Sequence, residues 1–308
     1  MSVFEKIVLV TRKTRLDELV ERFNTRAQAQ FYIEHAGGDF SAYVAEHDAY
    51  QQSLEVVRRS IEAGLKIQVM DRALVPSYVF AKSDLIVTLG QDGLVANTAK
   101  YVGGQPIVAV NPDPNRFDGI LLPFHSGDLR PNLERALGGK SLMRAITLAE
   151  ARSKDGQRLL AFNDLFIGAG THISARYRIR HGDKRENHSS SGIIVSTGAG
   201  STGWLSSIFN ETSGILEFLG GAPVKPIRME WEEDRLLFIV REPFVSRHSQ
   251  ATIVAGTILP EAPLALESQM PTGGVIFSDG VEADHLDFNS GSIANIRIAP
   301  EKANLVVN

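Results

Sequence analysis

The sequence predicts an α/β domain followed by a β-rich domain. Two features of the chain indicate this: apolar strand-like runs alternate with helical stretches in the first half, and short strand-like runs broken by turn residues fill the second. The 308 residues suit two domains at roughly 150 residues each, and 43% hydrophobic content is that of a globular chain. We place the boundary at Gly138–Gly139, so that the domains span residues 1–138 and 139–308.

The first domain is expected to be doubly wound around a parallel sheet. Lys6–Val10 is a short apolar strand of the kind buried in parallel sheets, and Thr14 with Asp17 is typical of a variant helix N-cap. A second helical stretch extends from about 41 to 63 and stops at Gly64. Further strands are expected at 66–70, 84–89 and 106–110, and this alternation predicts a layered α/β fold.

The second domain is expected to be mostly β-structure. Only one clear helix is expected there, at about 201–209. The expected strands are 142–150, 159–168, 173–180, 192–197, 235–240, 251–255, 275–278 and 293–298.

Composition excludes several classes of function. Cysteine is absent, which removes disulfides, thiolate metal sites and cysteine nucleophiles. The net charge is −4, so the chain lacks the basic excess typical of a nucleic-acid binder, and we expect no nucleic-acid partner. No signal-peptide pattern and no run of about 20 apolar residues is present, so we expect a cytoplasmic protein without a membrane partner.

The first candidate site is the turn Gly90–Gly93, which follows a buried strand. Ligands of open α/β sheets bind beyond the carboxyl ends of the strands, and glycines let the backbone approach phosphate. Asp92 would lie there, where a carboxylate could take a proton from a hydroxyl. The alternative is an ordinary turn or N-cap aspartate.

The second candidate site is the loop Ser196–Trp204, which holds three glycines and four hydroxyl-bearing residues before a helix. Free backbone N–H groups in such a loop suit phosphate oxygens. The alternative is a structural glycine turn. A dinucleotide-binding fingerprint in Gly198, Gly200 and Gly203 is disfavoured, because the residues after Phe209 resemble a loop and strands rather than the rest of a βαβ unit.

Two further groups of polar residues are candidate binding residues. Asn163 and Asp164 interrupt an apolar run, so either the protein's own backbone or a ligand must satisfy them. Arg176, Arg178 and Arg180 alternate along one strand face, which indicates a solvated hairpin or an anion site. Patterns for a Walker loop, a protein kinase, a zinc helix and a nucleophile elbow are missing from the sequence.

Taken together, these segments resemble the NAD kinase family, in particular a bacterial-looking member of its mitochondrial-type branch. The family's G-G-D-G motif resembles Gly90–Gly93, its N-E pair resembles Asn163–Asp164, and its T-P-T-G-S-T-A-Y loop resembles Thr197–Trp204. The mitochondrial-type branch adds motifs similar to Val110–Arg116, Ser190–Gly192 and Arg241–Pro243. The order and spacing agree from about residue 84 to 298.

The resemblance implies an N-terminal domain like those of NAD and diacylglycerol kinases, a β-rich C-terminal domain, and transfer of the ATP γ-phosphoryl group to the 2′-hydroxyl of the adenosine ribose of NAD, giving NADP. Asp92 would be the catalytic carboxylate, Mg²⁺ would bridge the ATP phosphates, and the protein would form homodimers or homotetramers. The residues that would bind ATP or NAD are Gly90, Gln91, Gly93, Asn163, Asp164, Gly200, Ser201, Thr202, Gly203, Trp204 and Ser207.

The sequence departs from the family pattern at Gln91, Asp164 and Ala199. If position 91 required a positive φ, the Cβ of Gln91 would cost on the order of 1 kcal/mol. Asp164 is one methylene shorter than the family glutamate, and Ala199 lacks a hydroxyl. Gln91 and Ala199 leave open a catalytically silent nucleotide-binding or regulatory protein of the same fold. A related lipid or sugar kinase is a further alternative, because the Gly90–Gly93 turn resembles that of diacylglycerol-kinase-like and phosphofructokinase-like enzymes.

Overall fold

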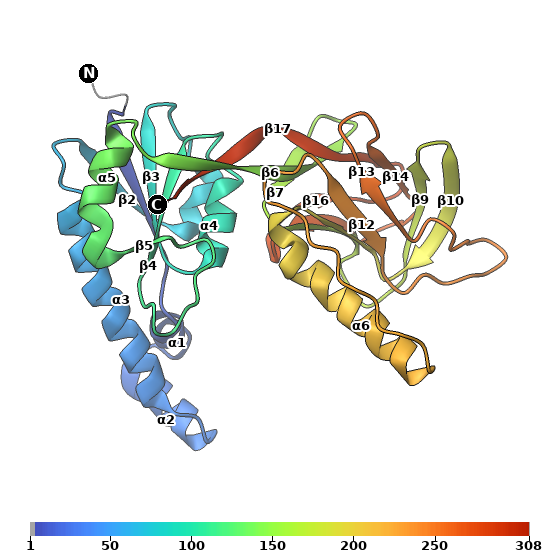
Figure 1. Cartoon of the computed structure of the whole chain (residues 1–308). Coiled ribbons are helices and arrows are strands. Elements are labelled where there is room, and N and C mark those ends of the chain that lie inside the picture. The colour runs from blue at the N-terminus through green and yellow to red at the C-terminus, as the bar shows by residue number, and fades with distance from the viewer. Residues whose placement is uncertain (1–3, 308) are drawn as a thin grey trace. The chain divides into compact units, whose positions relative to one another are not determined.

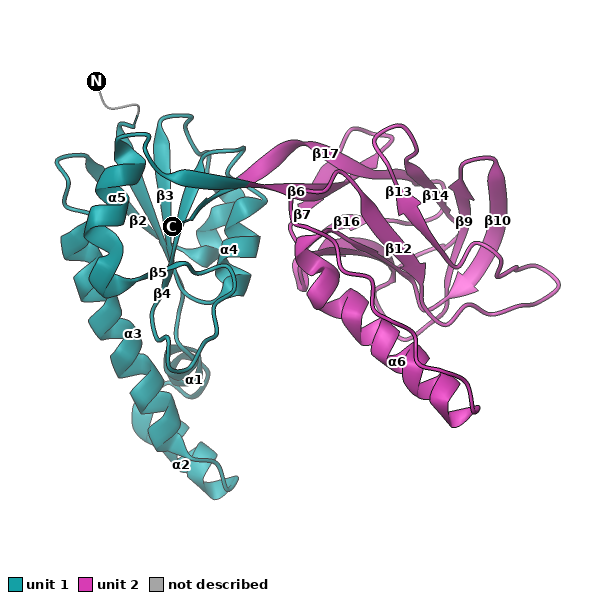
Figure 2. Ribbon diagram, in the orientation of Figure 1, with its two compact units in different colours: residues 1–144, 304–308 teal, residues 145–303 magenta. Residues whose placement is uncertain are grey.

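The computed structural model describes residues 4–307 (Figure 1) and divides into two compact units (Figure 2). Within these residues, unit 1 comprises 4–144 and 304–307, and unit 2 comprises 145–303. The chain passes between the units twice, within β6 (Leu142–Ser153) and within β17 (Ile293–Val307). The expected division into domains 1–138 and 139–308 stays a prediction.

Unit 1 is built on a parallel sheet in the order β2–β1–β3–β4, and β5 and the end of β17 pair with the other edge of β4. Every residue of β3 is buried, Asp84 and Thr88 included, as in the central strand of a parallel sheet. The strands predicted at 6–10, 66–70, 84–89 and 106–110 are confirmed. Their bounds are β1 (Lys6–Thr11), β2 (Lys66–Asp71), β3 (Asp84–Leu89), β4 (Pro106–Asn111) and β5 (Phe124–His125).

Helices cover both faces of this sheet, which confirms the doubly wound prediction (Figure 1). On one face, Val57 of α3 and Leu133 of α5 pack with Leu9 of β1, and α4 covers the opposite face. The Thr14 side chain and Asp17 form the expected N-cap. The helices are α1 (Arg15–Phe23), α2 (Arg26–His35), α3 (Phe40–Ser60), η1 (Arg72–Ser77), α4 (Asp92–Ala99), η2 (Ser126–Asp128) and α5 (Leu129–Leu137).

Unit 2 consists of two mainly antiparallel sheets that enclose one apolar core. One sheet has the order β10–β9–β14–β17, with β6 beside β17 and β7 beside β6; the other has the order β13–β12–β11–β8–β15–β16. Buried side chains of both sheets share the core, so the β-rich prediction is confirmed. The remaining strands are β7 (Arg158–Ala161), β8 (Asp164–Ala169), β9 (Ala175–His181), β10 (Lys184–Ser190), β11 (Ile193–Ser196), β12 (Leu236–Val240), β13 (Ala255–Ile258), β14 (Leu264–Ser268), β15 (Gly274–Ser278) and β16 (Val281–Asp287).

Several predicted elements of unit 2 were wrong in extent. The strand expected at 251–255 overlaps β13 only at Ala255, and the strand expected at 293–298 is the first part of β17. The strand expected at 159–168 is two strands, β7 and β8, which separate at Phe162–Asn163. The helix expected at 201–209 is a 3₁₀ turn, η3 (Ala199–Thr202), followed by α6 (Trp204–Phe218), so the loop expected after Phe209 is helix. β11 and β12, the strands before and after α6, are antiparallel, so this segment is not a βαβ unit, as expected where the dinucleotide fingerprint was disfavoured.

Candidate functional site

The carboxyl edge of the unit 1 sheet has a topological switch point between β1 and β3. The chain leaves β1 toward β2 on one side, whereas β3 leads to β4 on the other. Ligands of open α/β sheets bind in the crevice at such a point. Val10 pairs with Thr88, so Arg12 after β1 and Gly90 after β3 emerge together at this edge.

Asp92 is the first residue of α4 and is half-buried. One carboxylate oxygen, Oδ1, accepts a hydrogen bond of 2.6 Å from the Leu121 N–H. No ion pair of Asp92 occurs within residues 4–307, so the carboxylate is not neutralised by a cation of the chain. A carboxylate in this position, held by one backbone donor, retains acceptor capacity for a hydroxyl proton.

The turn Gly90–Gly93 has an ordinary backbone. Gln91 is the N-cap of α4 with φ −87°, so its Cβ carries no left-handed strain, and it makes no side-chain capping bond. A Cβ at Gly90 would lie 2.7 Å from Leu94 Cδ2, whereas one at Gly93 would meet nothing within 4 Å. A Cβ at position 90 would therefore displace the Leu94 side chain, whereas glycine at 93 leaves open space at the start of α4.

In unit 2, Asn163 and Asp164 are positioned by a carboxylate that is distant in sequence. Asp279 accepts hydrogen bonds from the backbone N–H groups of Phe162, Asn163 and Asp164, at 3.0, 2.6 and 3.2 Å. Because these N–H groups donate to Asp279, strand pairing is interrupted between β7 and β8. The half-buried Asn163 side chain makes no hydrogen bond to any described residue, so its amide is available to a ligand.

Asp164 is 9% exposed and its Oδ1 has no hydrogen-bond partner among the described side chains and backbone. Burial raises the pKa of Asp164 to about 7, partly opposed by a hydrogen bond with Ser196, and the nearby Asp279 charge raises the pKa further. The carboxyl group is therefore protonated at a much higher pH than an exposed aspartate. In the protonated form it is a hydrogen-bond donor as well as an acceptor.

The second glycine loop is packed mainly against the protein itself. Cβ atoms at Gly198 and Gly200 would lie 2.0 Å from Glu230 O and 2.3 Å from Asn163 O. The Gly200 N–H is bonded to Thr197 Oγ1 and the Gly203 N–H to Gly200 O, so these donors are not free for phosphate. The loop therefore packs against Asn163 and leads directly into α6.

The exposed part of this loop lies at its end. Thr202, Gly203 and Ser207 are exposed and Trp204 is half-buried, whereas Gly200 and Ser201 are buried. α6 begins at Trp204 without a side-chain cap. Of the residues predicted to bind the dinucleotide through this loop, the exposed ones can touch a ligand directly and the buried ones support the loop.

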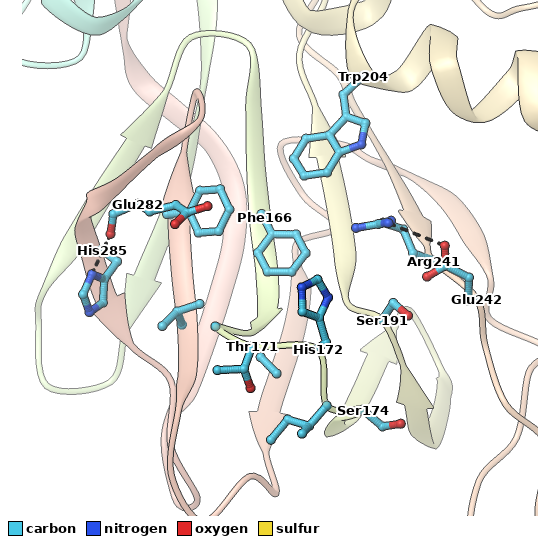
Figure 3. A pocket seen from close by; sticks show the side chains of 15 residues that line it. Phe166, Thr171, His172, Ser174, Ser191, Trp204, Arg241, Glu242, Glu282 and His285 are labelled. Atoms are coloured by element: carbon cyan, nitrogen blue, oxygen red, sulfur yellow. Dashed lines mark hydrogen bonds and ion pairs between the residues drawn. The ribbon is translucent and has the colours of Figure 1, made fainter. Parts of the chain in front are cut away.

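Beside Trp204, unit 2 contains a cavity of about 850 Å³ (Figure 3). Phe166 stacks on Trp204 at 6.0 Å and on Phe277 at 4.9 Å between ring centroids. The Arg241 guanidinium lies 5.6 Å from the centre of the Trp204 ring, and the Arg241 and His172 side chains lie near Phe166 (Figure 3). Stacked aromatic faces with polar groups at their edges suit a flat heteroaromatic ring.

Sequence reasoning missed four residues of these sites: Arg12, Phe166, Phe277 and Asp279. Phe166 and Phe277 read as ordinary core residues of apolar strands, and nothing in the local sequence pairs them with Trp204. Asp279 followed by Gly280 is a turn signal that could have marked it.

The arginines of β9 form a charged sheet face. Arg178 pairs with Glu267 at 2.7 Å, whereas Arg176 and Arg180 are exposed and have no ion-pair partner among residues 4–307. The solvated-hairpin interpretation fits this arrangement, since β9 and β10 form an antiparallel hairpin at the edge of the sheet.

Asp92 belongs to unit 1, while Asn163, Asp164 and Trp204 belong to unit 2. Their convergence on one nucleotide site stays a prediction, as do the individual binding roles.

Proteins of known structure share this architecture. A crystal structure of yeast NADH kinase complexed with NADH aligns over 98% of this chain and 83% of its own, with a TM-score of 0.59 and 16% identity. An NAD kinase from Archaeoglobus fulgidus in complex with ATP aligns over 98% and 94%, with a TM-score of 0.55 and 17% identity. The fold is therefore that of the NAD kinases.

Sequence relatives lead to the same family. The chain is 34% identical to the NAD kinase of Heliobacterium modesticaldum over 184 residues, 55% of this chain and 63% of that protein. It is 22% identical to human mitochondrial NAD kinase 2 over 372 aligned positions, 96% of this chain and 82% of that protein. The matches span 46% to 63% of the length of three bacterial relatives, and no model of a known protein family matches. In sequence and in fold, the chain is therefore similar to NAD kinases.

Proposed function

We propose that this protein is an ATP-dependent NAD kinase. The 2′-hydroxyl oxygen of the adenosine ribose of NAD forms a bond to the γ-phosphorus of ATP, and the bond from that phosphorus to the β-phosphate oxygen breaks, which yields NADP and ADP. Relatives named NAD kinase and structural neighbours bound to NADH or ATP support the proposal.

The observation that carries the proposal is the position of Asp92. Its carboxylate lies in the first turn of an uncapped helix, at the carboxyl edge of the sheet and next to the switch point. Asp92 would accept the proton that leaves the ribose hydroxyl, while the open space at Gly93 admits phosphate. Phosphoryl transfer depends mainly on such positioning and on charge neutralisation.

The residues of unit 2 would bind the dinucleotide. The free amide of Asn163 suits ribose hydroxyls or a carboxamide, and Asp164 would add a hydrogen bond in its protonated form. Thr202, Gly203, Trp204 and Ser207 would line the pocket from the end of the glycine loop.

Mg²⁺ would enter with ATP. No group of three or more His, Cys, Asp or Glu side chains that could hold a metal ion occurs in the described part of the chain. The ATP phosphates would therefore supply most of the ligands, as Mg²⁺ commonly allows, and the ion would neutralise charge on the transferred group.

The assembly and the location of the protein also remain predictions. We expect a homodimer or homotetramer, which light scattering of the purified protein measures directly. In residues 4–307 no helix combines the length and the apolar character that crossing a membrane requires. The cytoplasmic location stays an expectation from the sequence.

The experiment that tests the function compares wild type with Asp92→Asn. With NAD, ATP and Mg²⁺, we expect the wild type to form NADP and the variant to lose turnover by about a hundredfold or more, because the proton acceptor is gone. NAD affinity should stay within about tenfold, or roughly 1.4 kcal/mol.

Asp48→Asn is the matched control, since Asp48 is exposed on α3 of the same unit. It should leave turnover unchanged. A wild type that binds NAD but forms no NADP would contradict the proposal and favour the silent nucleotide-binding alternative. A substrate panel of NAD, NADH, a diacylglycerol and a sugar phosphate distinguishes an NAD kinase from a lipid or sugar kinase.

A further inference from the structure

Arg12 occupies the switch point beside the Asp92 turn. It follows β1 directly, and its Cδ lies 3.5 Å from where a Cβ on Gly90 would stand. Its side chain therefore runs alongside the turn that begins at Gly90. A larger residue at position 90 would crowd it.

The Arg12 side chain is fixed and nine-tenths buried. Its Nη2 donates to Glu46 Oε1 at 3.2 Å, and its guanidinium lies 5.7 Å from the centre of the Tyr50 ring. Tyr50 in turn donates to the Leu89 carbonyl at 3.2 Å, which ties this support to the end of β3. The guanidinium is thus preorganised next to the turn.

One donor of this fixed guanidinium is unsatisfied. Arg12 Nε is buried and has no hydrogen-bond partner among residues 4–307. A buried N–H of a charged group without a partner is unfavourable, and such groups are rare unless a ligand completes them. The unsatisfied atom is bonded to the same Cδ that adjoins Gly90, so it lies at the switch point.

Arg12 belongs to an ion-pair network with more guanidinium groups than carboxylates. The buried Glu46 carboxylate is shared by Arg12, by Arg15 through a bond of 2.6 Å to its Nε, and by Arg116, whose Nη1 lies 4.0 Å away. Asp113 contacts Arg116 at 3.4 Å. Two carboxylates thus face three guanidinium groups in this ion-pair network. The α4 N-terminus beside them adds a partial positive charge without a side-chain cap, and it carries the Asp92 carboxylate.

We propose that Arg12 and Arg116 bind the polyphosphate of the phosphoryl donor, a nucleoside triphosphate, with Arg12 Nε donating to a phosphate oxygen. This inference rests on the proposed function and deepens it, because it assigns the donor side of the reaction to residues outside the glycine turn. Guanidinium groups suit phosphate oxygens in geometry and charge. Arg116, whose side chain is 32% exposed, is the accessible member of the pair, and Arg12 is the fixed one.

The experiment measures the KM of ATP and the KM of NAD separately in Arg12→Lys, Arg12→Gln and Arg116→Gln. Removal of a charge-assisted donor should raise the KM of ATP by about tenfold and leave the KM of NAD within about twofold. Arg12→Lys keeps the charge but lacks the Nε–H, so it should show the same split. Arg59→Gln, at an exposed site on α3, should change neither value.

A second measurement does not need turnover. Isothermal titration with inorganic triphosphate and Mg²⁺, in the absence of NAD, should show affinity about tenfold weaker in each variant than in wild type and Arg59→Gln. Circular dichroism and the melting temperature identify any variant that fails to fold. In that case Arg116→Gln, the variant at the more exposed site, decides the result.

The outcomes separate this inference from the proposed function. NADP formation with an unchanged KM of ATP in folded Arg12 and Arg116 variants overturns the inference and leaves the function standing. Triphosphate binding that depends on these arginines in a wild type that forms no NADP supports the inference and overturns the function. A parallel rise in both KM values shows a structural role instead and also overturns the inference.

Discussion

The buried carboxyl group of Asp164 should make the stability of unit 2 fall as pH rises. Its pKa is about 7 in the folded protein, against an ordinary value of 3.8, mainly because burial penalises the charged form. Between these two pH values the unfolded chain binds fewer protons than the folded one. Stability is therefore fully present below about pH 4 and is lost progressively up to about pH 7.

The magnitude follows from the two pKa values. The complete loss corresponds to about 4 kcal/mol, and about 2 kcal/mol of it falls between pH 5 and 7. Asp164→Asn removes the ionisation while keeping the size of the side chain. From pH 5 to 7 the free energy of unfolding of the wild type should therefore fall by this amount relative to that of the variant. Any pH-independent effect of the amide on stability does not change this difference.

Urea denaturation followed by tryptophan fluorescence measures this difference. Trp204 and Trp231 are the only tryptophans of the chain and both lie in unit 2, so the signal reports the unfolding of that unit. Asp183→Asn, in the exposed turn between β9 and β10, is the control and should follow the wild-type pH profile. Parallel wild-type and Asp164→Asn profiles from pH 5 to 7.5 would refute the assigned pKa and its cause.

Two further substitutions test the glycine-bearing turns. Gly200→Ala would place a Cβ 2.3 Å from Asn163 O and should lower the free energy of unfolding by about 1–3 kcal/mol or more. Gly214→Ala in α6, where a Cβ would meet nothing within 4 Å, is the control and should not destabilise the protein. Equal urea midpoints for the two variants would contradict this packing. Gln91→Gly should change NADP formation only a few-fold, because φ at this N-cap is −87° and no strain is relieved. A silent wild type with an active Gln91→Gly variant would instead show that the glutamine side chain blocks the site.

Local sequence predicted the features that depend on short-range patterns. The mainly apolar sequences of β1, β3 and β4 indicate buried strands, and Thr14 with Asp17 indicates a helix start. The position of Asp92 after β3 follows from the same reasoning. By contrast, β10 and β16 are rich in polar and charged residues, and β14 is only five residues long. Pairing with neighbouring strands, rather than their own composition, makes them strands.

The sequence by itself determined the fold class, the location of both glycine-bearing turns and the Asn163–Asp164 pair, because each is encoded within a few consecutive residues. Only the tertiary structure decided that Asp279 breaks the strand at Asn163, that Asp164 is buried enough to hold its proton near neutral pH, and that Arg12 adjoins Gly90. These properties arise from groups tens to more than a hundred residues apart. Burial and electrostatics depend on distance in space, which local periodicity does not specify.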